Sequence, residues 1–228
     1  MEKNSASKKA LPLSSDETRL IFIRHGQSMG NFHHLFLGHT DLDLSELGYQ
    51  QADLACQYVF ENYDVAQIYA SDLLRAYHTV QPLADRLGIT VQKRSELREI
   101  YAGDWEGMAF DDIQARYPEA FDIWCKQIEN ATCTNGESVA SLYARITVEA
   151  EYLAKSHPGE TICMGSHATP IRMLGTLWNG IPFEKAHELP FPTNASVSVA
   201  IYKNGKFSRC EKYSFDDFMG DIKTKLKF

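Results

Sequence analysis

The chain has 228 residues, of which 44% are hydrophobic and 23% charged, enough apolar material for one large α/β domain of an ordinary soluble kind. Its formal net charge of −7, from 30 acidic and 23 basic side chains, argues against a nucleic-acid-binding protein, because such proteins present a basic surface. The five cysteines are scattered and form no CxxC pair, a pattern typical of free thiols rather than of a disulfide framework or a zinc site.

Residues 1–18 are mostly small, polar or charged and are predicted to be disordered. They contain no apolar run long enough for a signal peptide, and no later segment approaches the ~18 apolar residues of a membrane helix. Together with the free thiols, this predicts a cytoplasmic protein with no membrane partner. We expect residues 19–228 to form a single domain.

Strands and helices alternate in the first half of the chain. The apolar run at 20–23 predicts a buried strand that ends at Gly26, and a helix is expected to begin at Ser45. A strand over 67–71 and a helix over 73–87, which Pro82 would kink or interrupt, come next. Short strands are expected at 90–94 and around Leu97.

The second half begins with an aromatic and acidic stretch, 101–137, which predicts a lid-like insertion with one or two short helices. A clear helical pattern starts at Ser138, where apolar residues recur every three or four positions. A buried strand at 161–166 and a helix beginning at Pro170 are expected next. Alternation over 197–202 and a turn at Asn204–Gly205 then predict a closing hairpin.

The last segment places apolar residues at helical spacing, and its acids precede its lysines, as the helix dipole favours. Docking on the chain's own domain is preferred to a partner surface. The apolar residues are Phe215, Phe218, Met219, Ile222 and Leu226.

Alternating strands and helices predict a three-layer α/β/α sandwich with a mainly parallel central sheet. In such sheets, ligands bind beyond the carboxyl ends of the strands. The reactive side chains follow the predicted strands at those ends, so we expect them to meet at one edge. They are Arg24, His25, Arg75, Glu99 and His167.

These residue types suit phosphoryl transfer. Neutral imidazole is a nucleophile that can carry a covalent intermediate. Arginine matches phosphate oxygens in geometry and charge. A carboxyl group can protonate the departing oxygen. Each residue alone would more often be structural or a surface charge, and it is their expected convergence that favours a site.

The segments around these residues resemble the histidine phosphatase superfamily, in the branch of the cofactor-dependent phosphoglycerate mutases (branch 1). RHGQSMGN begins the resemblance, which covers most of residues 19–200 in the family's order. The RHG triplet alone would be weak evidence, whereas the ordered set is specific. The further segments are GHTDLDLSELGYQQA (38–52), SDLLRAYHT (71–79), LREIYAGDWEG (97–107), GES (136–138) and SHATPIR (166–172).

The resemblance implies a phosphoglycerate mutase-like fold and a phosphatase that hydrolyses a small phosphomonoester. His25 would become phosphohistidine, and Glu99 would act as general acid and then activate water. The phosphoryl oxygens would be surrounded by Arg24, Arg75 and His167, with Ser28 and Asn31 as secondary phosphate ligands. No metal and no cofactor is implied. A small phosphorylated metabolite is the expected partner, and a homodimer stays open.

Three features qualify this interpretation. Relatives commonly have two small residues after the second histidine, whereas Ala168 and Thr169 stand here, and a positive φ at Ala168 would strain the backbone. His33, His34 and His39 match no compact metal-ligand motif and are read as a polar loop. Some of the insertion's aromatics are expected to line the pocket and others to pack the domain; they are Trp105, Phe110, Phe121 and Trp124.

Two alternatives to a phosphatase stay open. A phosphoglycerate mutase-type phosphotransferase must hold a second charged group of its substrate. Residues 101–137 contain eight acids against only Arg116 and Lys126, so hydrolysis is favoured. A non-catalytic relative that binds a phospho-ligand or a protein would be expected to have lost His25, Glu99 or His167. The sequence does not identify the natural substrate.

Overall fold

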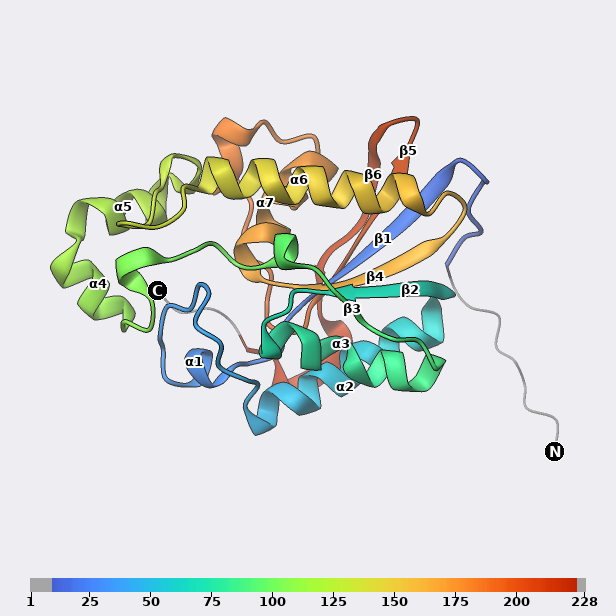
Figure 1. The fold of residues 1–228 in the computed structure, drawn as a ribbon, viewed down its shortest axis with the longest axis horizontal. Coiled ribbons are helices and arrows are strands. Elements are labelled where there is room, and N and C mark those ends of the chain that lie inside the picture. Colours follow the sequence, from blue (N-terminus) through green and yellow to red (C-terminus); the bar gives the residue numbers. More distant parts are fainter. Residues whose placement is uncertain (1–9, 225–228) are drawn as a thin grey trace.

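The computed structural model describes residues 10–224, in which helices cover both faces of one six-stranded sheet (Figure 1). The strands lie in the order β3-β2-β4-β1-β5-β6. The first four strands along the chain pair in parallel, and the last two form an antiparallel hairpin next to β1, so the predicted mainly parallel sheet is confirmed. The strands are β1 (Glu17–Arg24), β2 (Val65–Ala70), β3 (Gln92–Lys93), β4 (Thr161–Ser166), β5 (Val197–Lys203) and β6 (Lys206–Phe215).

The helices connect these strands or extend from them. The α-helices are α1 (Met29–Phe32), α2 (Glu46–Asn62), α3 (Leu74–Leu87), α4 (Phe110–Arg116), α5 (Pro118–Lys126), α6 (Val139–Ser156) and α7 (Ala168–Trp178). The 3-10 helices are η1 (Ser95–Leu97), η2 (Gly103–Trp105), η3 (Ile128–Asn130), η4 (Phe183–Glu188) and η5 (Asp217–Ile222). No helix within residues 10–224 is both long enough and apolar enough to cross a lipid bilayer.

Strand β1 shows why the sheet needs two layers of helices. Leu20 and Phe22 point to one face, into a core shared with α6 and α7. Ile21 and Ile23 point to the other, into a core shared with α2 and α3. All four are fully buried, because successive side chains of a strand alternate between its faces.

Local signals set several helix boundaries. Ser45 and Ser138 cap α2 and α6 by accepting hydrogen bonds from the backbone N–H groups of Gly48 and Ser141, both at 3.1 Å. At the C-terminal end of α3, Gly88 adopts the left-handed conformation, with φ of 68°. Pro82 lies inside α3 without ending it, so the expected interruption does not occur.

The predicted N-terminal boundary was wrong by two residues, because β1 begins at Glu17. Thr18 is buried, and its hydroxyl donates to the carbonyls of Ala154 and His157 at 2.8 and 2.9 Å. This contact draws the start of the strand onto the end of α6. Of the segment predicted to be disordered, residues 1–9 lie outside the described residues.

Three other predicted elements differ from the structure. Leu97 lies in η1 rather than in a strand. Helix α7 begins at Ala168, two residues before Pro170, which therefore falls in its first turn. The C-terminal segment is not one helix: Phe215 ends β6, η5 follows, and Leu226 lies outside the described residues.

The described part of the C-terminal segment nevertheless docks on its own domain, as expected. Met219 is buried in the core shared with α2 and α3. The ring of Phe218 stacks on that of Tyr58, with centroids 4.9 Å apart. Helices α4 and α5 lie within 101–137, the segment that the sequence predicts to be an insertion, and they sit together at one end of the molecule (Figure 1).

Candidate active site

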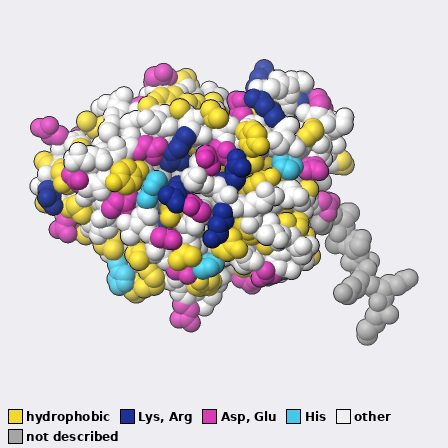
Figure 2. Space-filling model, viewed as in Figure 1, with side chains coloured by type: hydrophobic (Ala, Val, Ile, Leu, Met, Phe, Trp, Pro, Cys, Tyr) yellow, Lys and Arg dark blue, Asp and Glu magenta, His cyan; other side chains and the backbone are white. Residues whose placement is uncertain are grey.

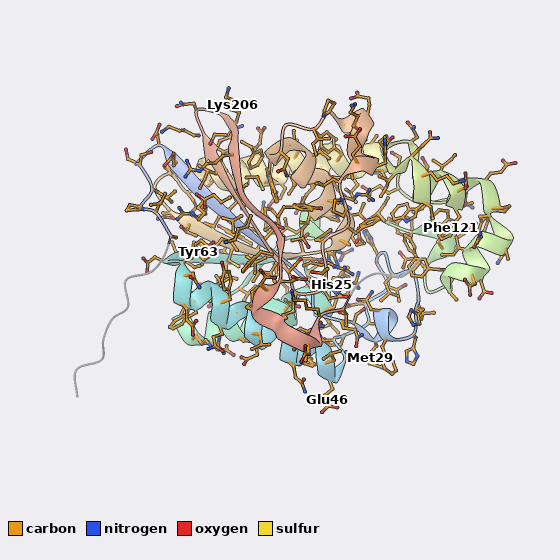
Figure 3. All side chains as sticks on the ribbon, turned by 180° about the vertical axis from the view of Figure 1, so that it is seen from behind. His25, Met29, Glu46, Tyr63, Phe121 and Lys206 are labelled. Carbon is orange, nitrogen blue, oxygen red and sulfur yellow. The ribbon has the colours of Figure 1, made fainter. Side chains whose placement is uncertain are left out.

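Four of the five residues that the sequence places at strand ends line one pocket, and the fifth, His167, packs against one of them. His25 directly follows β1, and it lies near the centre of the molecule (Figure 3). Arg75 lies in the first turn of α3, and Glu99 follows η1. These side chains line the same pocket together with Arg24. His167, just after β4, packs against His25 with ring centroids 5.2 Å apart.

The His25 ring is held in one orientation. Its Nδ1 lies 2.8 Å from the carbonyl oxygen of Gly26, which can only accept, so Nδ1 carries the proton. Nε2 is then left with its lone pair. Burial lowers the pKa of His25 well below 6.5, and the nearby charges of Arg75 and Arg24 lower it further. The geometry and charges therefore favour a neutral imidazole with one nucleophilic nitrogen.

Arg24 and Arg75 are cations buried beside this imidazole, each 1% exposed. Arg24 Nη1 donates to the Pro192 carbonyl at 2.6 Å, and Arg75 donates to those of Gly38 and Thr40 at 2.7 and 2.8 Å. The Nε of each arginine finds no hydrogen-bond partner within residues 10–224. Burial lowers both pKa values to about 10, so both remain charged at neutral pH. Buried N–H groups and uncompensated charge favour binding of an anion.

His167 is fully buried, and neither ring nitrogen has a hydrogen-bond partner in the described part of the chain. Burial, and after it the charge of Arg75, lowers its pKa well below 6.5. A neutral imidazole still has one N–H to donate to a phosphoryl oxygen. The expected strain at Ala168 is absent, because this residue opens α7 and is not among the residues with positive φ.

Glu99 provides a buried carboxyl group at 7% exposure. Its two oxygens accept from the backbone N–H groups of Ile100 at 2.8 Å and Thr169 at 3.2 Å. Burial raises the pKa of Glu99 in spite of these hydrogen bonds. The group is therefore suited to hold a proton and release it to a departing oxygen.

Ser28 and Asn31 line the pocket and also close the first turn of α1. The Ser28 hydroxyl accepts from the Asn31 backbone at 3.1 Å, and Asn31 Oδ1 accepts from the Ser28 backbone at 3.2 Å. Asn194 then donates through Nδ2 to Asn31 Oδ1 at 3.0 Å and to the His25 carbonyl at 3.2 Å. This asparagine, which the sequence interpretation missed, connects the segment before β5 to His25.

Two further residues hold the backbone of Glu99, a role that the sequence interpretation gave to neither of them. Arg145 Nη2 donates to the Glu99 carbonyl at 2.8 Å, and its Nη1 donates to the Arg98 carbonyl at 2.9 Å. His39 Nε2 lies 3.0 Å from the same Glu99 oxygen. Arg145 had no sequence signal, because α6 is distant from Glu99 along the chain, whereas His39 was interpreted only as part of a polar loop.

The remaining candidates separate into pocket and framework residues. Trp105, Phe121 and Trp124 all pack in the core, and of the four aromatic candidates Phe110 and Trp124 line the pocket. His39 positions the backbone, as above. Within residues 10–224 no group of three or more histidine, cysteine, aspartate or glutamate side chains could hold a metal ion.

The fold and this site together are those of an α/β protein in which two buried arginines and an oriented imidazole share one pocket, an arrangement suited to a phosphoryl group. The family model of the histidine phosphatase superfamily (branch 1) matches residues 20–213, and the chain belongs to this superfamily. It is accordingly a phosphoric monoester hydrolase, in agreement with the sequence interpretation.

Individual relatives are similar over most of their length. Phosphoserine phosphatase 1 of Hydrogenobacter thermophilus is 35% identical over 182 residues, which cover 79% of this chain and 85% of that protein. The solved structure of a mycobacterial glucosyl-3-phosphoglycerate phosphatase with VO3 is 30% identical, with a TM-score of 0.76, and the match covers 86% of this chain and 98% of that one. The solved structure of Bacillus stearothermophilus YhfR has a TM-score of 0.81 at 26% identity, and the match covers 87% of this chain and 97% of that one.

Proposed function

We propose that this phosphatase works through a phosphohistidine on His25. Nε2 of His25 attacks phosphorus, and the bond from phosphorus to the ester oxygen breaks. The proton of Glu99 moves to that oxygen, so the leaving group departs as an alcohol. The resulting Glu99 carboxylate then takes a proton from water as the water attacks phosphorus. This second step releases inorganic phosphate and restores both side chains.

The single observation that carries the proposal is the position of a neutral, oriented imidazole between two buried arginines. The unpartnered Nε groups of Arg24 and Arg75, together with the His167 ring, supply N–H donors for the equatorial oxygens of a transferring phosphoryl group. Ser28 and Asn31 add polar groups to the lining of the same pocket. Charge stabilisation by such fixed donors is commonly the largest contribution to catalysis.

The charges around the pocket support hydrolysis over transfer to a second anionic acceptor. Lys126 of the insertion pairs with Asp122, and Arg116 lies over the ring of Tyr117 at 5.5 Å. Neither cation is among the residues that line the pocket. Names of relatives such as phosphoserine phosphatase and glucosyl-3-phosphoglycerate phosphatase differ in substrate, so the proposal for this chain stays at the level of a small phosphomonoester.

A trapping experiment tests the nucleophile. Rapid acid-free quenching and mass spectrometry should find one phosphate on the peptide that contains His25 during turnover of nitrophenyl phosphate. His25→Ala should lose this adduct and all turnover, whereas the exposed His33→Ala should keep both. Phosphate found on another residue, or turnover by His25→Ala, would contradict the proposal.

We also propose a cytoplasmic location, because all five cysteines are free thiols.

A further inference from the structure

The pocket has a polar floor and an apolar wall. Beyond the proposed phosphoryl-binding residues, its lining consists largely of aliphatic and aromatic side chains from the loop after α1, from the insertion and from the segment before β5. These are Leu35, Phe36, Leu37, Phe110, Trp124 and Phe191. Any part of a substrate that extends beyond the phosphoryl group must contact this wall.

The cationic side chains of the pocket belong to the proposed phosphoryl-binding residues. Among the described residues that line it, the cationic side chains are Arg24 and Arg75, and both face the phosphoryl position. Arg172 is buried nearby but is not a lining residue. Its guanidinium lies over the Phe191 ring at 4.2 Å, and its Nη2 donates to the His187 carbonyl at 3.1 Å. A carboxylate or second phosphate on the leaving group would therefore find no cation at the wall.

The insertion that supplies Phe110 and Trp124 adds a repulsive field. Its residues 101–137 carry eight acidic and two basic side chains. On the face shown in Figure 2, the end of the molecule formed by α4 and α5 displays mainly acidic charges. An anionic leaving group would lose hydration at the apolar wall and also be repelled on approach.

We propose that this phosphatase selects phosphomonoesters whose leaving group is uncharged and largely apolar, and that Phe110, Trp124 and Phe191 contact that group. The inference rests on the proposed function and adds the class of substrate to it. Trp124 lines the pocket, and its buried indole Nε1 has no hydrogen-bond partner within residues 10–224. Aromatic side chains provide large contact area for such leaving groups.

Two esters of nearly equal size test the inference: 4-carbamoylphenyl phosphate, with a neutral amide, and 4-carboxyphenyl phosphate, with a carboxylate. The full chain should hydrolyse the phosphate ester of 4-carbamoylphenyl phosphate with a kcat/KM at least about 100-fold higher than that of 4-carboxyphenyl phosphate. The reason is that an unpaired buried charge is far less favourable than a satisfied neutral group. Equal values, or a preference for the carboxylate, would overturn the inference while leaving the phosphatase function intact. Absence of turnover and of phosphohistidine with both esters would instead refute the proposed function.

A charge-introducing variant gives a second readout. Leu35→Arg adds a cation to the wall and should raise the carboxylate-to-amide ratio of kcat/KM by at least about tenfold. The matched control is Val148→Arg, which adds the same charge on α6 at a side chain that is 70% exposed and not part of the pocket. The control should leave the ratio unchanged. An equal rise in both variants would show that net charge rather than the wall sets selectivity, and would overturn the inference.

Discussion

Glu99→Gln is the most informative single substitution, because it separates the proton donor from the shape of the pocket. The glutamine has the same length and retains a carbonyl oxygen, which can still accept from Ile100 or Thr169. An amide cannot release a proton at neutral pH. The shape of the pocket should therefore persist, while the departing oxygen should no longer have a proton donor.

The size of the effect should depend on the leaving group. General acid catalysis contributes about 10²–10⁴-fold, or roughly 3–5 kcal/mol of barrier at 1.36 kcal/mol for each factor of ten. Burial raises the pKa of Glu99, which increases the protonated fraction of the free enzyme near neutral pH. We expect a loss of about 10³-fold for an alkyl ester, whose alkoxide is strongly basic, and of less than about tenfold for nitrophenyl phosphate.

The assay must isolate phosphorylation of His25, because the same carboxylate is proposed to activate water afterwards. Single-turnover rates for an alkyl ester and nitrophenyl phosphate should be compared by rapid quench. Glu96→Gln, at an exposed carboxylate three positions earlier, is the control and should change neither rate. Equal losses for both esters in Glu99→Gln would refute the general-acid role and leave His25 as nucleophile.

The same pair of proteins gives a stability test. Since the folded-state pKa of Glu99 is raised above 4.5, the folded protein retains a proton that the unfolded chain has lost at the same pH. The contribution of Glu99 to stability is therefore fully present below pH 4.5 and decreases as pH rises through the folded-state pKa. Denaturant unfolding should show wild type losing stability relative to Glu99→Gln over that range. A gain would contradict the raised pKa.

Four further predictions follow from the site and the core. Vanadate and inorganic phosphate should inhibit competitively, and a crystal structure with either anion should place it against the buried cations and histidines; an anion bound only elsewhere would count against the site. EDTA should leave activity unchanged, and a loss restored by magnesium or zinc would refute a metal-independent reaction. Because burial depresses the pKa of His25, its phosphorylation rate, corrected for substrate ionisation, should not fall as pH drops through 6.5; a decline centred at 6.5 would show an ordinary histidine. Trp105→Ala should lower the free energy of unfolding by about 3–5 kcal/mol, because this side chain is fully buried, and a loss below about 1 kcal/mol would show that the core collapses around the cavity.

Local sequence signals were sufficient where the structure depends on neighbouring residues. The apolar run at 161–166 is β4, and Ser45 and Ser138 are the caps of α2 and α6. The single helix expected from Phe215 onward is wrong over its described part, because helical spacing of apolar residues does not exclude a strand whose partner lies elsewhere along the chain. Phe215 completes the β6 ladder by pairing with Val197, which no local pattern reveals.

The sequence by itself determined which residues reach the pocket floor. Parallel strands bring their carboxyl ends to one edge, so a reactive side chain directly after a strand is placed by topology, as for His25 and His167. Glu99 follows η1 and reaches the pocket without a strand directly before it. The resemblance to a family added roles that the residue types alone left open. Both kinds of inference depend on order along the chain, which the sequence contains.

Only the tertiary structure decided how those side chains are held and what surrounds them. Arg145 reaches the carbonyl of Glu99 across 46 residues, and Asn194 reaches that of His25 across 169. Trp105 and Trp124 belong to the same insertion and both pack in the core, yet of the two only Trp124 also lines the pocket. The side-chain type alone does not predict which of the two lines the pocket. Burial of an aromatic side chain is favourable against any apolar surface, and the sequence encodes no directional preference for it. Packing geometry alone selects which ring also lines the pocket.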